Sequence, residues 1–323
     1  MMRDDRETGP AGPQPPVEIE HDIPVDAPTA PGRPLLGVLL FVFGVLLLAC
    51  MDAITKVLVA SYPPPVVVGV RYVVNCLLLA AVLAPSHGAK LVQTNRTGLV
   101  LVRGACLASV SILMAIALTR LPVAEATSIN FIFPTLVMLL AGPVLGERIS
   151  RRGWVAAAMG FAGVLLIARP GAGLEPVGVL LALCAATMGA FYQLLSRVLA
   201  ATERTMALTF YTALIGAVVF GLAAPFVWDG QTPGTRDVML FLALGACAGL
   251  GHYIFTAAHR YAPVSALAPL SYVQLVYAGL LGWLVFGHVP APLSIVGMLV
   301  VVAAGLLITL KPRTLMAALL RRA

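Results

Sequence analysis

The sequence predicts an all-α polytopic membrane protein whose ten transmembrane helices form two inverted five-helix repeats, with the N- and C-termini in the cytoplasm. Three observations support this fold class. Of the 323 residues, 60% are hydrophobic and 11% are charged, whereas a soluble domain contains about 25% charged residues. Ten apolar segments each approach the roughly 20 residues that a membrane-spanning helix needs. The second half of the chain also matches the first at a shift of 141 residues.

The N-terminal segment differs in composition from the remainder of the chain. Because residues 1–34 are acidic, rich in proline and without hydrophobic periodicity, we expect a disordered cytoplasmic tail. The apolar run from Leu35 continues past Cys50 without a small-residue cleavage site, which indicates a membrane anchor and not a signal peptide. The predicted spans are 35–60, 64–84, 98–119, 123–145, 153–168, 176–200, 205–227, 238–258, 263–286 and 292–310. Residues 313–323 are expected to form a basic cytoplasmic C-terminal tail.

The basic residues set the predicted orientation. The net charge is +7, which in a soluble protein would suggest nucleic-acid binding. With a cytoplasmic N-terminus, however, the inner loops and adjoining helix ends hold most of the 21 Lys and Arg residues, and the outer loops hold only Arg120, Arg169 and Arg236. This asymmetry follows the positive-inside rule. We therefore attribute the basic charge to membrane topology and expect no nucleic-acid partner.

The internal repeat organises the membrane domain. The shift of 141 residues aligns Lys56-Val57-Leu58 with Arg197-Val198-Leu199, Gly104-Ala105-Cys106 with Gly245-Ala246-Cys247, and Pro122-Val123 with Pro263-Val264. It predicts one five-helix repeat over residues 35–171 and another over residues 172–312. Because each repeat has an odd number of spans, the second enters the membrane in the opposite orientation, as in many secondary transporters.

Motifs for catalysis and for cofactor binding are not found. The five cysteines lie within spans without close pairs, which argues against disulfides and against a metal site. The sequence contains no nucleotide-binding loop of the Gly-Lys-Ser/Thr type. We therefore predict no catalytic residue, no metal and no cofactor, and transport that depends on a gradient or on exchange.

Charged residues within the membrane are the first candidates for function, because each must face a cavity or a partner. Asp52 and Lys56 lie four residues apart on one helix face, and Arg71 and Glu125 are expected at a similar depth from the outer surface. We predict that these four residues form a charge network that substrate or a proton opens. The alternatives are a fixed structural network, or Lys56 reaching to the interface. Arg103 is expected to be an interfacial anchor.

Neutral polar residues extend this candidate site. Asn75 lies one turn after Arg71, and Asn130 lies about a turn after Glu125, although buried amides also serve simply as interhelical hydrogen bonds. The second half contributes a hydrogen-bonding, largely aromatic lining, for which the candidates are Gln193, His252, Tyr272, Gln274 and Tyr277. Such a cavity would suit a zwitterionic or heteroaromatic metabolite. For some tyrosines the alternative is an interfacial belt, and for His252 it is a core histidine.

Proline and glycine mark two architectural features. Pro134, inside the fourth predicted span, removes a helical hydrogen bond and predicts a hinge at a half-helix. Gly245 and Gly249 have the small-xxx-small spacing that allows two helices to approach closely.

Several segments resemble one family of membrane carriers. They are Met51 to Lys56, Arg71, the run from Glu125 through Pro134 to Arg148, and the weaker Gly282 to Pro290. Over residues 35–312 the chain resembles the drug/metabolite transporter superfamily, and within it the ten-helix EamA-type carriers. The resemblance implies a proton-coupled or gradient-driven carrier of small metabolites, frequently an exporter. His288 stands where many members have an acidic residue, so the role of that carboxylate does not transfer.

The prediction is therefore a secondary transporter of the bacterial inner membrane that moves a small polar metabolite. The favoured function is export of an amino-acid-like or amino-acid-derived compound, including metal-chelating metallophores. The first alternative is uptake of riboflavin or S-adenosylmethionine, as in some carriers that the chain resembles. The second is an integral membrane enzyme acting on lipids, which would normally carry an Asp-rich or Ser/His motif. The expected partners are a small-molecule substrate and the lipid bilayer, and a homodimer remains an open alternative.

Overall fold

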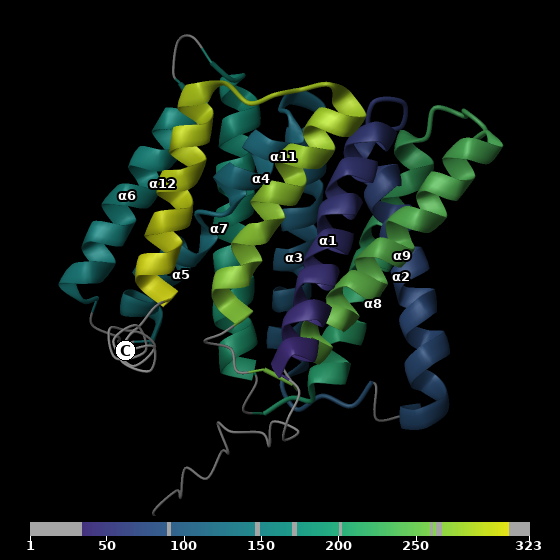
Figure 1. Ribbon diagram of the computed structural model, residues 1–323. Helices are drawn as coiled ribbons and strands as arrows, with labels where there is room; N and C mark the ends of the chain where they lie inside the picture. Colours follow the sequence, from purple (N-terminus) through teal and green to yellow (C-terminus); the bar gives the residue numbers. More distant parts are fainter. Residues whose placement is uncertain are drawn as a thin grey trace, which may run out of the picture.

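The structure is a bundle of membrane-length helices (Figure 1). The computed structural model describes residues 34–88, 92–145, 149–169, 173–199, 202–258, 261–262 and 267–309. The first predicted repeat contains α1 (Pro34–Leu58), α2 (Pro64–His87), α3 (Thr97–Arg120), α4 (Val123–Asn130), α5 (Phe133–Leu145) and α6 (Arg151–Ala168). The second contains α7 (Pro176–Leu199), α8 (Thr205–Val227), α9 (Thr235–Ala258), the 3-10 helix η2 (Ala268–Tyr272), α11 (Val273–Phe286) and α12 (Pro292–Thr309).

The helices confirm the predicted ten-helix membrane fold. Within the residues that the structure describes, eight helical segments are long and apolar enough to cross a membrane. Two shorter apolar segments, Leu270–Phe286 and Pro292–Leu307, supply the ninth and tenth predicted spans. The tails predicted at 1–34 and 313–323 lie outside the described residues, apart from Pro34, where α1 begins. We call the side where α1 begins the inner side, following the predicted topology; it is at the bottom of Figure 1.

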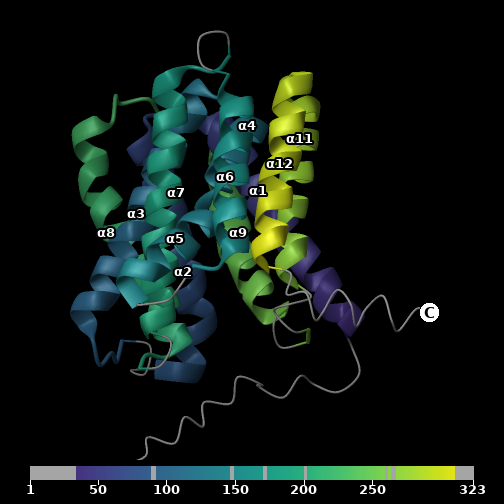
Figure 2. The ribbon, with the colours of Figure 1, turned by 90° about the vertical axis from the view of Figure 1, so that its left-hand side faces the viewer.

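The two repeats are interlocked. Helix α1 packs along α9 and α11, and its repeat counterpart α7 packs along α3, α4 and α5. These contacts define two helix groups, the α1 group (α1, α9, η2 and α11) and the α7 group (α7, α3, α4 and α5). The remaining helices pair with their own counterparts, α2 with α8 and α6 with α12, and the second pair lies side by side in Figure 2. Each group therefore combines helices of both repeats.

The fourth span is broken, as Pro134 predicted. Helix α4 ends at Asn130 and α5 begins at Phe133, because the proline nitrogen cannot donate to the Asn130 carbonyl and its ring clashes with that turn. The ninth span changes type at the equivalent place, where the 3-10 turn of η2 ends at Tyr272 and α11 begins at Val273. A shift of 141 residues relates Phe131 to Tyr272. Interrupted helices at corresponding positions of two repeats are typical of transporter binding sites.

The two interruptions touch each other. The rings of Phe131 and Tyr272 have their centroids 5.5 Å apart, and both side chains are buried. Residues that are equivalent in two inverted repeats can contact one another only close to the axis that relates the repeats. The pair therefore lies close to this axis. A side chain at Gly305 of α12 would collide with the Tyr272 hydroxyl.

The close approach of α2 and α9 provides a test of this packing. A Cβ atom at Gly245 would collide with the Cβ of Val74, whereas a Cβ at Gly279 of α11 would meet open space. We expect Gly245→Ala to destabilise the protein by about 1–3 kcal/mol, the usual cost of overpacking, and Gly279→Ala to leave it unchanged or slightly more stable. Thermal unfolding of the purified variants measures the difference. Equal midpoints for the two variants would contradict this packing.

Candidate functional site

A buried guanidinium lies within the membrane between α1, α2 and α9. Arg71 of α2 is 8% exposed, and its Nη1 lies 3.8 Å from the thioether sulfur of Met51. Its guanidinium also lies 5.1 Å from the centre of the Tyr72 ring. Among the described residues, no carboxylate lies within ion-pair distance of Arg71. An arginine in hydrocarbon is costly without an anionic partner, so this position suits an anionic group of a ligand.

Asp52 lies beside this arginine and contacts the second repeat. Its carboxylate accepts a hydrogen bond of 3.3 Å from the amide nitrogen of Gln274, and it interacts electrostatically with Arg71. Gln274 is the second residue of α11, directly after the 3-10 turn, so the interruption of the ninth span sets its direction. His252 of α9 also interacts electrostatically with Arg71. We refer to Asp52, Arg71, His252 and Gln274 as the central cluster.

The structure divides the predicted four-charge network. Lys56 donates hydrogen bonds of 2.8 Å and 2.6 Å to the carbonyl oxygens of Leu118 and Leu121. It thereby satisfies carbonyl groups at the C-terminal end of α3. Glu125 instead meets His288, with 3.0 Å between Oε1 and Nε2. The prediction of one network was therefore wrong. Lys56 and Glu125 form contacts near the outer side, whereas Asp52 and Arg71 belong to the deeper central cluster. Lys56 also does not simply extend to the interface, since it caps a neighbouring helix.

The outer contacts border a small cavity of about 240 Å³. Lys56, Arg120 and His288 line it together with Phe286 and the α3–α4 turn. Arg120 forms an ion pair with Glu175. Glu125 lies nearly fully buried, 2% exposed, and its second carboxylate oxygen, Oε2, has no hydrogen-bond partner. We call this cavity the outer vestibule.

Other predicted residues take different positions. The amide oxygen of Asn75 is buried without a hydrogen-bond partner, and Asn130 is half-buried at the end of α4. Gln193, the repeat counterpart of Asp52, is exposed on α7 and forms no contact with the central cluster among the described residues. Tyr277 packs near the inner ends of α1 and α9. Tyr272 contacts Phe131.

Arg103 is a buried residue that the sequence reasoning placed wrongly. Instead of anchoring at the interface, it donates to the Tyr192 hydroxyl (2.7 Å), the Ser196 hydroxyl (2.7 Å), the Thr212 hydroxyl (2.8 Å) and the Leu208 carbonyl (3.0 Å). Its guanidinium also lies 4.4 Å from the centre of the Tyr192 ring. One feature of the sequence could have indicated this site. Tyr192 and Ser196 are four residues apart, so their hydroxyl groups share one face of α7.

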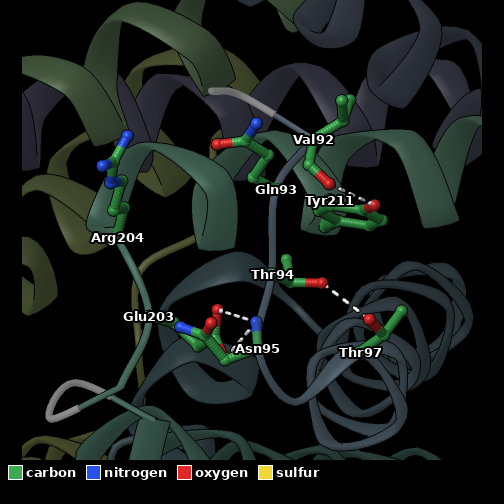
Figure 3. Close-up of a pocket in the computed structure, with 8 residues that line it drawn as sticks. All are labelled: Val92, Gln93, Thr94, Asn95, Thr97, Glu203, Arg204 and Tyr211. Carbon is green, nitrogen blue, oxygen red and sulfur yellow. Dashed lines mark hydrogen bonds between the residues drawn. The ribbon is translucent and has the colours of Figure 1, made fainter. Parts of the chain in front are cut away.

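A second cavity, of about 490 Å³, opens at the inner side (Figure 3). The buried carboxylate of Glu203 accepts hydrogen bonds from the backbone amides of Asn95 and Arg96, at 3.0 Å and 2.7 Å. These bonds tie the α7–α8 turn to the residues that precede α3. The Tyr211 hydroxyl donates to the Val92 carbonyl at 3.0 Å on another wall. Arg204 and Gln93 complete the polar lining that Figure 3 shows.

The outer side carries the repeat-related counterpart of the Glu203 contact. Under the 141-residue shift Tyr62 corresponds to Glu203, and Asp237 corresponds to Arg96. The Tyr62 hydroxyl donates to the Asp237 carboxylate at 2.7 Å. The equivalent turn of each repeat is therefore bonded to residues near the start of a helix of the other repeat. Glu203 forms this bond with its carboxylate, and Tyr62 forms it with its phenol hydroxyl.

Comparison with known proteins identifies the family. The model of the EamA-like transporter family matches residues 35–169 and again residues 176–310. The chain belongs to the EamA-like transporter family. The double match agrees with the two helical repeats, and it makes this EamA-like protein a multi-pass transporter of small molecules in the inner membrane.

Characterised relatives of this EamA-like transporter differ in substrate and direction. It is 29% identical to a pseudopaline exporter of Pseudomonas aeruginosa over 273 residues, which cover 83% of this chain and 94% of the relative. It is 26% identical to an S-adenosylmethionine uptake transporter of Rickettsia felis, over 69% of this chain and 75% of the relative. It is also 26% identical to a riboflavin transporter of Brucella anthropi, over 71% and 82% respectively.

A solved structure supports the fold of this EamA-like transporter independently. One crystal structure superposes on the chain with a TM-score of 0.63, covering 86% of this chain and 98% of that protein. Because the sequence identity is 22%, this similarity concerns the fold alone.

The Tyr62 contact predicts a pH effect on stability. The hydrogen bond to Asp237 raises the pKa of Tyr62 above its ordinary value of 10.0. A group whose pKa rises on folding stabilises the folded state below its unfolded pKa, and this contribution disappears as the pH rises through the folded pKa. We therefore expect stability to fall more steeply above about pH 10 in the parent chain than in Tyr62→Phe.

Chemical denaturation between pH 8 and pH 11 measures this difference, with Tyr253→Phe as the control because Tyr253 is half exposed. The control should follow the parent curve. Identical alkaline slopes for Tyr62→Phe and the parent would show that the Asp237 bond does not contribute.

Proposed function

We propose that the protein exports a small zwitterionic, amino-acid-like compound from the cytoplasm, and that the central cluster binds it. The observation that carries the proposal is the buried Arg71, which lacks a carboxylate at ion-pair distance among the described residues although it lies inside the membrane domain. A carboxylate of the substrate would supply that partner. The guanidinium suits this task because it presents several donors in a planar fork.

Asp52 would bind the opposite end of the same substrate. Its carboxylate has one hydrogen bond from Gln274, and a carboxylate has about four lone-pair sites, so it can accept further bonds from an ammonium group. A cation site beside an anion site, both fixed by packed helices, favours a zwitterion over a singly charged molecule. Amino acids and amino-acid-derived metal chelators have this charge pattern.

The direction of transport is inferred from similarity. The pseudopaline exporter aligns with a larger share of both chains than the uptake transporters do, which supports export. The second candidate is uptake of a larger metabolite, and the similarity to the S-adenosylmethionine and riboflavin transporters supports it. Coupling to a gradient or to exchange is part of the proposal for either direction.

Comparison of metabolites inside and outside cells, with and without the protein, tests direction and substrate together. We expect a zwitterionic compound to accumulate inside cells and to decrease in the medium when the protein is absent. Media poor in transition metals should be included, because metal chelators are produced there. If an external nutrient is instead left unconsumed, the carrier works in uptake and the proposed direction is wrong.

The same assay tests the proposed site. Arg71→Gln removes charge-assisted hydrogen bonds, each of which is worth about 1.5–3 kcal/mol, so we expect transport of the identified compound to fall about tenfold or more. Arg236→Gln is the matched control, since Arg236 is exposed on the outer side, and its transport should stay within about twofold of the parent. Arg71→Gln protein that inserts normally and transports at the parent rate would refute the site.

A further inference from the structure

The α1 group and the α7 group meet at the outer side through two polar contacts. Lys56 of α1 crosses to the C-terminal carbonyls of α3, and Glu125 of α4 crosses to His288 at the end of α11. Each contact joins one helix group to the other, and together they border the outer vestibule. We call these two contacts the outer gate, since the groups cannot separate at the outer side while both are formed.

Glu125 is the chemically unusual member of the gate. One oxygen meets His288, and the other is buried without a donor. A buried carboxylate oxygen without a hydrogen-bond donor is costly. The ionised carboxylate of Glu125 therefore depends on its two neighbours, Lys56 and His288.

His288 provides a route for such a proton. Its side chain is 36% exposed and its Nε2 touches the Glu125 carboxylate, and it lines the outer vestibule. An imidazole can accept a proton from water at one ring nitrogen and donate a proton from the other. A proton from the outer solution can therefore reach a carboxyl group that is itself buried.

We propose that Glu125 and His288 form a proton-binding site that controls the outer gate. With Glu125 ionised, its carboxylate attracts both Lys56 and His288 and holds the two helix groups together. A proton that passes from Nε2 of His288 to Oε1 of Glu125, the two atoms already in contact, neutralises the carboxyl group and removes this attraction, and the outer side then opens. The inference rests on the proposed transport function and names the ligand that regulates it.

Thermodynamic linkage determines whether acid opens or closes the outer gate. A ligand shifts a conformational equilibrium only toward the state that binds it better. In the closed gate Lys56 and His288 stabilise the ionised carboxylate, and in the open gate both are withdrawn. The open gate therefore binds the proton better, and acid on the outer side favours opening, by at most about tenfold per pH unit for a single proton.

Other titratable groups near α4 do not replace this site. The charged or titratable residues on the elements that pack against α4 are Cys50, Asp52, Lys56, Arg103, Cys106, Arg120, Arg151, Arg152, Cys184, Tyr192, Arg197 and Tyr277. Arg120 and Glu175, at the outer ends of α3 and α7, are paired with each other. Asp52 is bonded to Gln274 in the central cluster. Within the described residues, only His288 contacts the Glu125 carboxylate directly.

Cysteine labelling from the outer side tests the proposal. Ser128 lies one turn deeper than Glu125 on α4 and is fully buried, so a cysteine there should react with a membrane-impermeant thiol reagent only when the gate opens. A cysteine at Thr119, which lines the vestibule, corrects for the pH dependence of the reagent. The parent chain, with its five native cysteines, gives the background.

We expect the labelling ratio of Ser128→Cys to Thr119→Cys to rise severalfold as the outer pH falls from 8 to 5.5. Adding Glu125→Gln, which imitates the protonated carboxyl group, should keep the ratio high at every pH. Glu125→Asp, which retains a carboxylate, should keep a pH response, and so should the matched control Glu175→Gln. Labelling at Thr119→Cys reports whether each variant folds and inserts.

A ratio that is independent of pH in the parent background would overturn the proposal, as would a parent-like pH response in the Glu125→Gln background. Labelling requires no substrate. The proton site can therefore fail while export of the metabolite is confirmed, and export can fail while the pH response is observed.

Discussion

The contact between Phe131 and Tyr272 is the interaction on which the arrangement of the transporter depends. It joins the interruptions of the fourth and ninth spans, which are related by the repeat. Irregular backbone at membrane depth is tolerated only where protein or an internal cavity surrounds it. The ring at each interruption packs against the ring at the other, and both side chains are buried.

The contact between Phe131 and Tyr272 fixes the position of the polar residues that follow Tyr272 in the chain. Gln274 lies two residues after Tyr272 and reaches Asp52, whereas its repeat counterpart is Phe133, and the counterpart of Asp52 is Gln193. Arg71 likewise corresponds to Thr212. The repeats share a backbone plan but differ in charge, so the fold contains one charged central cluster. This asymmetry suits a carrier that binds one zwitterionic substrate in a pseudo-symmetric framework.

Sequence reasoning recovered the helices and their inversion because apolar length, the positive-inside bias and a 141-residue repeat are local or linear signals. Pro134 marked the broken span for the same reason, since its chemistry acts within one turn. The division of charges was not accessible, because the depth of Glu125 and Lys56 does not reveal which neighbouring helix each one faces. The burial of Arg103 depends on Tyr192 and Thr212 of the other repeat, and such contacts require the rotation of each helix to be known.

Transport through the proposed site requires the α1 and α7 groups to move against each other around the contact between Phe131 and Tyr272. Spin-label distances at both ends test it most directly, with one pair at the exposed outer residues Thr119 and Val289 and another at the exposed inner residues Leu35 and Thr97. The account predicts that the transported compound changes the two distances in opposite directions, so that one end opens as the other closes. Distances that both stay constant, or that both increase together, would contradict it.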